Sequence, residues 1–116
     1  MKIVFISDFF EDQIRGGAEI YDGILISLLN KAGNKVVRFR SHLITDKHVR
    51  LYRESGFHFI ISNFCNIGKF PYEELMKVRG CYSILEHDHK YIIERDPSHY
   101  KDFLVPAERI RFREFY

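Results

Sequence analysis

The sequence predicts a doubly wound α/β domain, in which helices cover both faces of a parallel sheet. Three features near the start of the chain support this fold class. Residues 2–7 form an apolar, β-branched run with the length of one buried strand. Gly16 and Gly17 open an amphipathic segment that ends at Gly33, and residues 36–39 have the composition of a second strand. Strand, glycine pair, helix and strand form the first unit of such a domain.

The first two helices are predicted from periodicity and capping residues. A helix over residues 17–32 carries one apolar stripe, and Gly33 is placed to end it. The stripe consists of Ala18, Tyr21, Leu25, Leu28, Leu29 and Ala32. A second helix is expected over residues 45–54, because Thr45 or Asp46 can cap its start and a glycine follows its end.

The alternation of strands and helices continues along the chain. Residues 57–62 are predicted to form a third strand, and residues 81–85 a fourth. Between them, Pro71 suits the first turn of a helix that ends before Gly80.

The last 31 residues differ in character. Residues 86–106 are long, polar and aromatic, and residues 107–116 are predicted to be helical again. Phe112, Phe115 and Tyr116 are apolar, with nothing after them to pack against. We therefore expect the chain to be part of a larger protein.

Right-handed crossovers leave few topologies for this element order. The strand order 3-2-1-4 is predicted, in a Rossmann-like parallel sheet with flanking helices. The first and fourth strands then flank the switch point where such sheets bind ligands. The loops over residues 7–17 and 86–90 would line that crevice.

Composition narrows the class of protein. A chain of 116 residues with 11 Phe and 7 Tyr can build one domain, here residues 1–116. The formal net charge is +2 and the signs alternate, which argues against nucleic acid binding. No apolar run reaches the length of a transmembrane segment or a signal-peptide core, so we expect a cytoplasmic protein. Cys65 and Cys81 lie in different predicted elements and are expected to be reduced thiols.

The glycine pair is the first candidate site. Gly16 and Gly17 allow close approach of a ligand, and the amides of Gly17, Ala18 and Glu19 are helix-start donors that could hold a phosphate or carboxylate. The pattern is neither Gly-x-Gly-x-x-Gly nor Gly-Lys-Ser/Thr, so no nucleotide cofactor is expected. The alternative is a tight turn that needs a positive φ, with Glu19 capping the helix.

The second candidate site is the segment from Glu86 to His89. Its imidazoles and carboxylates suit general acid/base work or recognition of hydroxyl groups, with Asp88 able to orient His87. His87 and His89 could also share a metal ion, but no clear third ligand accompanies them, and we expect no metal. A solvated polar turn is the alternative. Asn63, after the third strand, could hydrogen-bond a sugar-like ligand or form an Asx-turn.

Several of these segments together resemble a known family. Residues 2–7, Gly16-Gly17-Ala18-Glu19 and residues 28–37 resemble the amino-terminal domain of GT-B glycosyltransferases, most of all the retaining group that includes the family-four sugar transferases. Where that family has a Gly-His-Glu-Val-like turn, this chain has Gly33-Asn-Lys-Val36. The segment Glu86-His-Asp-His-Lys-Tyr91 resembles the His-bearing loop after strand four. The resemblance covers nearly the whole chain.

The resemblance implies transfer of a sugar from a nucleotide-sugar donor to the hydroxyl group of an unknown acceptor. Gly16 and Gly17 would lie against the donor diphosphate, and His87 with Asp88 would face the reacting sugar. Most of that family's nucleotide site belongs to a C-terminal domain of the same protein. This chain would then be the acceptor-side half, inactive alone. The alternative is a stand-alone α/β ligand-binding or interaction domain without catalysis, whose aromatic residues 112–116 dock a partner.

Overall fold

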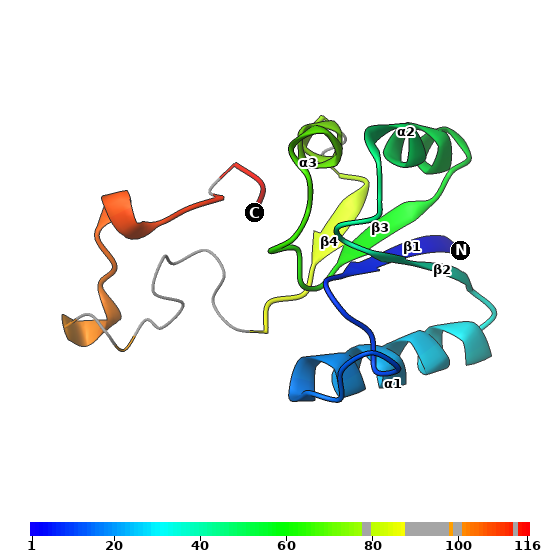
Figure 1. Cartoon of the computed structure of the whole chain (residues 1–116), viewed down its shortest axis with the longest axis horizontal. Coiled ribbons are helices and arrows are strands. Elements are labelled where there is room, and N and C mark those ends of the chain that lie inside the picture. Colours follow the sequence, from blue (N-terminus) through cyan, green and yellow to red (C-terminus); the bar gives the residue numbers. More distant parts are fainter. Residues whose placement is uncertain (78–79, 88–97, 99–100, 113) are drawn as a thin grey trace. The chain divides into compact units, whose positions relative to one another are not determined.

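The computed structural model describes residues 1–77, 80–87, 98, 101–112 and 114–116 (Figure 1). The chain divides into two compact units, Met1–Leu85 and Glu86–Tyr116, and each is described by itself. The first unit is α/β, with a four-stranded, all-parallel sheet. Its elements are β1 (Lys2–Ser7), α1 (Gly17–Lys31), β2 (Lys35–Arg40), α2 (Asp46–Glu54), β3 (His58–Ile61), α3 (Lys69–Met76) and β4 (Tyr82–Ile84). Helix α1 covers one face of the sheet, and α2 and α3 cover the other (Figure 1).

The strand order is β2-β1-β3-β4, so the predicted order 3-2-1-4 is wrong. The apolar strands β1 and β3 pair with each other in the centre of the sheet. Strand β2 contains Lys35, Arg38 and Arg40, and it lies at an edge. The predicted order would have placed β2 between two strands under covered faces, where unpaired basic side chains are costly to bury. At an edge the same side chains reach solvent and discourage pairing with another chain.

The ends of the helices follow local signals, as predicted. Thr45 caps α2: its Oγ1 accepts from the His48 backbone N–H at 3.2 Å, and His48 Nδ1 accepts from the Thr45 backbone N–H at 3.1 Å. Helix α1 ends at Lys31, and Gly33 follows it with a φ of +90°. Beyond it the Asn34 N–H reaches the Leu29 carbonyl at 3.1 Å, which completes a Schellman turn.

The predicted buried stripe of α1 is only partly correct. Leu25 and Leu29 are half-buried, but Tyr21 and Leu28 are 53% and 57% exposed. The most deeply buried residue of the helix is Asp22. Apolar residues extend around more of α1 than the sheet can cover, so the sequence pattern alone did not show which side faces inward.

Helices α2 and α3 pack side by side and share a cluster of charges. Arg50 on α2 lies 3.0 Å from Asp46 and 3.1 Å from Glu74 of α3. Glu74 also accepts a hydrogen bond from Lys77 at 3.1 Å. That hydrogen bond, assisted by Arg50 and opposed by partial burial, holds the pKa of Glu74 below its usual value.

The core of the first unit lies between the two helical layers. The fully buried large side chains come mostly from β1 and β3, with contributions from α2 and α3. They include Val4, Phe5, Ile6, Val49, Phe59, Ile61 and Leu75. The described residues contain no helix with both the length and the apolar character needed to cross a bilayer.

In the second unit, the helix predicted over residues 107–116 is wrong. A 3₁₀ turn covers Ala107–Arg109, and Ile110 is already extended, with φ −90° and ψ 130°. Phe112 has a φ of +58°, which a helix does not allow.

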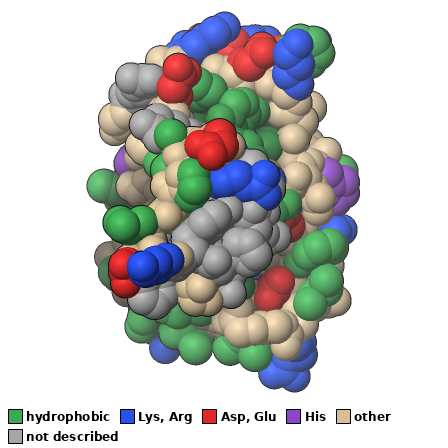
Figure 2. All heavy atoms as spheres, turned by 90° about the vertical axis from the view of Figure 1, so that its left-hand side faces the viewer, with side chains coloured by type: hydrophobic (Ala, Val, Ile, Leu, Met, Phe, Trp, Pro, Cys, Tyr) green, Lys and Arg blue, Asp and Glu red, His purple; other side chains and the backbone are tan. Residues whose placement is uncertain are grey.

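Charged side chains of both signs are interspersed over the described part of the face shown in Figure 2. Their mixture is consistent with a formal net charge of only +2. Apolar side chains lie singly or in small groups between them (Figure 2).

Candidate functional site at the carboxyl edge of the sheet

The strand order moves the switch point of the sheet. The chain goes from β1 to β2 on one side and then returns to place β3 on the other side of β1. The switch point, where such sheets bind ligands, therefore lies between β1 and β3. The loops over residues 8–16 and 62–68 follow these two strands. The prediction that β1 and β4 flank the switch point is wrong, because β3 separates them.

Asp8 connects the ends of three neighbouring strands. Its Oδ1 accepts hydrogen bonds from the Ser41 hydroxyl after β2 and from the Asn66 backbone N–H, the latter at 3.0 Å. Its Oδ2 accepts from the Cys65 backbone N–H at 3.1 Å. Asp8 is only 8% exposed, so these donors replace most of the water around its charge. Asp8 thereby shapes the loop after β3.

Sequence reasoning did not identify Asp8. A signal was available, because an acidic residue directly follows a buried apolar strand. A carboxylate in that position needs nearby donors. The donors come from residues more than thirty positions away, so their identity could not be predicted.

Three buried oxygen atoms accompany Asp8 at this edge. The Oγ atoms of Ser7 and Ser62 and the Oδ1 atom of Asn63 are buried and have no hydrogen-bond partner within the described part of the chain. Ser7 and Ser62 are both 0% exposed. Buried polar atoms in folded proteins nearly always have a partner, so this group marks a place where hydrogen-bond partners are missing from the described residues.

The two serines lie side by side on the α1 face of the sheet. Ile6 pairs with Ile61, so Ser7 and Ser62 occupy the next positions of the same register. Side chains alternate along a strand, so Ser7 shares its face with Phe5. The register partner of Phe5 is Arg38, which lines a pocket together with residues of α1.

Gly16 and Gly17 lie where predicted, at the start of α1. Gly16 is extended, with φ −88° and ψ 174°, and Gly17 does not have a positive φ, so the alternative of a positive-φ turn is wrong. A Cβ atom at Gly16 would lie 2.6 Å from Oε2 of Glu19, which shows that this carboxylate folds back over the helix start. A Cβ atom at Gly17 would meet nothing within 4 Å.

The position of Glu19 changes what the helix start can bind. The carboxylate complements the positive end of the helix dipole. An incoming free anion would meet this negative charge. A ligand with hydroxyl groups would instead find an acceptor beside the amides of the first turn.

The candidate residues after β4 follow an edge strand of the sheet, which β3 separates from β1. His87 is half-buried in the second unit, and Asp88 and His89 lie outside the described residues. The roles of His87, Asp88 and His89 stay predictions that rest on the resemblance. No group of three metal-ligating side chains occurs among the residues that the structure describes. Cys65 and Cys81 are thiols, as predicted.

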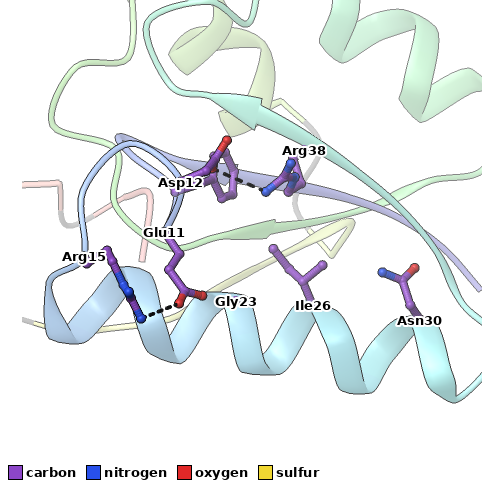
Figure 3. Close-up of a pocket in the computed structure, with 8 residues that line it drawn as sticks. Glu11, Asp12, Arg15, Gly23, Ile26, Asn30 and Arg38 are labelled. Carbon is purple, nitrogen blue, oxygen red and sulfur yellow. Dashed lines mark hydrogen bonds and ion pairs between the residues drawn. The ribbon is translucent and has the colours of Figure 1, made fainter.

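Two pockets share Phe10 and Arg38 in their described lining. The larger, about 730 Å³, lies between the loop after β1, the middle of α1 and β2 (Figure 3). Two ion pairs cross it: Arg15 with Glu11 at 3.5 Å and Arg38 with Asp12 at 3.7 Å. The smaller has a volume of about 370 Å³. The described lining of neither pocket includes a site residue predicted from the sequence.

No family model, curated protein or solved structure matches this chain. The functional argument therefore depends on the chain's own residues and on the general behaviour of parallel α/β sheets.

Proposed function

We propose that this chain is the acceptor-side domain of a GT-B-like glycosyltransferase and that its β1/β3 edge binds sugar hydroxyl groups. One observation carries the proposal: the buried oxygens of Ser7, Ser62 and Asn63 cluster at the switch point without partners among the described residues. Parallel α/β sheets bind their ligands at this point.

The chemistry of this edge matches a polyhydroxylated ligand. A sugar hydroxyl both donates and accepts hydrogen bonds, and so does a serine hydroxyl. The Asn63 oxygen and the Glu19 carboxylate add acceptors. Nothing in the local backbone requires glycine at position 17, where a Cβ atom would fit in open space. The absence of a side chain there leaves room for a ligand to approach the backbone closely.

The proposed reaction is transfer of a sugar from a nucleotide-sugar donor to an acceptor hydroxyl in the cytoplasm. Gly16 and Gly17 would face the donor diphosphate, whose binding the Glu19 carboxylate would oppose, and His87 with Asp88 would act on the acceptor hydroxyl as general base and orienting carboxylate. A C-terminal domain of the same protein would bind the nucleotide. Without that second wall the site cannot orient two substrates, so we expect the chain alone to be inactive.

A stand-alone ligand-binding domain is the second candidate. The order β2-β1-β3-β4 favours it, because doubly wound domains with this order bind a ligand at the β1/β3 point within a single domain. Such a domain would bind its ligand fully without any partner.

Titration of ¹⁵N-labelled chain, followed by amide chemical shifts, tests both candidates. The probes are glucose, uridine diphosphate (UDP), UDP-glucose and inorganic phosphate. The transferase proposal predicts that UDP-glucose shifts the amides of residues 17–19 and 62–66, and that it binds more tightly than glucose. Ser62→Ala should weaken this binding, whereas Ser27→Ala, at an exposed position of α1, should not.

The outcomes separate the two candidates. Tight glucose binding without any gain from the diphosphate would overturn the transferase proposal and favour the stand-alone domain. Glu19→Gln removes a negative charge from the helix start, so it should tighten UDP-glucose binding and leave glucose binding unimproved. Shifts confined to other surfaces would refute the assignment of the β1/β3 edge.

A further inference from the structure

We propose that the pocket at the carboxyl end of β2 binds a small aromatic anion, that is, a flat apolar ring bearing a phosphate or carboxylate group. The pocket has a volume of about 370 Å³, within the usual range for small-molecule sites. It lies entirely in the first unit and borders the β1/β3 edge, because Phe10 and Gln13 of its lining belong to the loop after β1. The inference does not rest on the proposed transferase function.

The described lining combines cations with an apolar floor. Arg38, Arg40 and His48 provide N–H donors, and Phe10, Phe39 and Leu43 provide apolar surface. No Asp or Glu belongs to the lining as far as the structure describes it. Two guanidinium groups without an acidic lining residue favour an anionic ligand. The side chain of Leu43 is 57% exposed and adds an apolar wall that a ring could cover.

Arg40 is held in place before any ligand arrives. Its Nε donates to the Asp8 carbonyl at 3.3 Å, and its guanidinium lies 5.0 Å from the centre of the Phe9 ring. No carboxylate among the described residues forms an ion pair with it. A charged group oriented in this way loses little entropy on binding, and its terminal nitrogens suit bidentate contact with an anion.

Arg38 is the second cationic wall. Its guanidinium lies 5.1 Å from the centre of the Phe10 ring. Its ion pair with Asp12 is long, 3.7 Å, and both side chains are more than half exposed. Such a surface pair contributes little to stability, so Arg38 can turn from Asp12 to a ligand at low cost.

His48 supplies a directed N–H donor. Its Nδ1 accepts a hydrogen bond from the Thr45 backbone N–H, so the ring proton of the neutral form is on Nε2. The ring lies 4.9 Å from that of Phe39, at an interplanar angle of 39°. The cap of α2 therefore fixes both the orientation and the tautomer of this donor.

Calorimetric titration of the full chain tests the inference with four probes: phenyl phosphate, benzoate, inorganic phosphate and benzyl alcohol. We expect phenyl phosphate or benzoate to bind at least about tenfold more tightly than either inorganic phosphate or benzyl alcohol, because only they engage both the cations and the floor. The comparison of phenyl phosphate with benzoate identifies which anionic group the site prefers. Amide shifts should map to residues 38–48.

Arg38→Gln should weaken binding of the preferred probe by about tenfold, the loss expected for one charge-assisted hydrogen bond. Arg53→Gln, on the last turn of α2 and outside the pocket, is the matched control for loss of one positive charge and should have no effect. Leu43→Ser should reduce the advantage of phenyl phosphate over inorganic phosphate. Equal binding of phenyl phosphate and inorganic phosphate, or equal losses in Arg38→Gln and Arg53→Gln, would overturn the inference.

Discussion

Replacement of Asp8 by alanine should destabilise the first unit more than any other single change to a charged residue of its loops. The carboxylate is 8% exposed and accepts hydrogen bonds from the Ser41 hydroxyl and from the backbone N–H groups of Cys65 and Asn66. The alanine variant deprives all these donors of their acceptor at once. Because the donors follow β2 and β3, the loss also loosens the loops on both sides of β1.

The magnitude follows from the exposure of each donor. A buried donor left without an acceptor costs about 1–3 kcal/mol. Ser41 is fully buried, so leaving its hydroxyl without an acceptor should cost about 2 kcal/mol. Cys65 and Asn66 lie at exposed positions, where water can partly replace the carboxylate, so each should cost about 1 kcal/mol. The total, about 4 kcal/mol, is a large share of the roughly 5–15 kcal/mol typical of a whole domain.

Urea unfolding followed by circular dichroism measures this loss. Asp8→Asn should lower the free energy of unfolding by less, about 2 kcal/mol, because its remaining oxygen can still accept a hydrogen bond. Its NH₂ group would face a donor and cannot accept from it. Asp12→Ala is the control: Asp12 is an exposed acid of the same loop, and its loss should cost less than about 1 kcal/mol. If Asp8→Ala were as stable as Asp12→Ala at an equal m-value, the assignment of Asp8 as the organiser of this edge would be refuted.

Three further predictions concern the helices and the core. Gly17→Ala should raise the free energy of unfolding by about 0.4–1 kcal/mol, since a Cβ atom there meets nothing. Gly33→Ala should lower the free energy of unfolding by about 1–2 kcal/mol, since the φ of Gly33 is +90°. Urea unfolding of both variants would contradict this reasoning if Gly17→Ala and Gly33→Ala changed the free energy of unfolding in the same direction. The pKa of Glu74 is lowered in the folded state, chiefly by Lys77, so its stabilising effect is present at neutral pH and disappears as the pH falls through that lowered pKa. Melting curves at several pH values should therefore give a higher melting temperature for the wild type than for Glu74→Gln at pH 7, and equal melting temperatures in acid. A difference in melting temperature that does not change with pH would contradict the mechanism. Phe59→Ala, at a fully buried position of β3, should cost about 3–5 kcal/mol, and a loss below about 1 kcal/mol in the same urea assay would show that β3 is not central.

Much of the secondary structure could be predicted because its signals are local. The Thr45 cap and the glycines at positions 33 and 56 fix the helix ends through contacts within a few residues of one another. The run over residues 2–7 has the apolar, branched composition of a buried strand, and the structure has β1 at Lys2–Ser7. The helix predicted near the C-terminus is wrong, because the backbone becomes extended at Ile110 and takes a positive φ at Phe112, and the spacing of apolar residues does not reveal such backbone changes.

The candidate site could be predicted only in part. The carboxyl edge of the sheet, with Gly16, Gly17 and Asn63, follows from the element order alone. The element order does not determine which strand lies beside β1 at the switch point, because right-handed crossovers permit β3 on either side of β1. The basic residues of β2 are typical of an edge strand, and the observed order places β2 at an edge.

The sequence by itself determined that this chain forms a parallel α/β unit, where α1 and α2 begin and end, and that its polar loops follow the strands. Only the tertiary structure decided which strands are neighbours, which side of α1 is buried, and which donors surround Asp8. The physical reason is the distance along the chain over which each interaction acts. Caps and turns are made by residues a few positions apart, whereas the partners of Asp8 lie 33 to 58 positions away and meet it only when the sheet assembles.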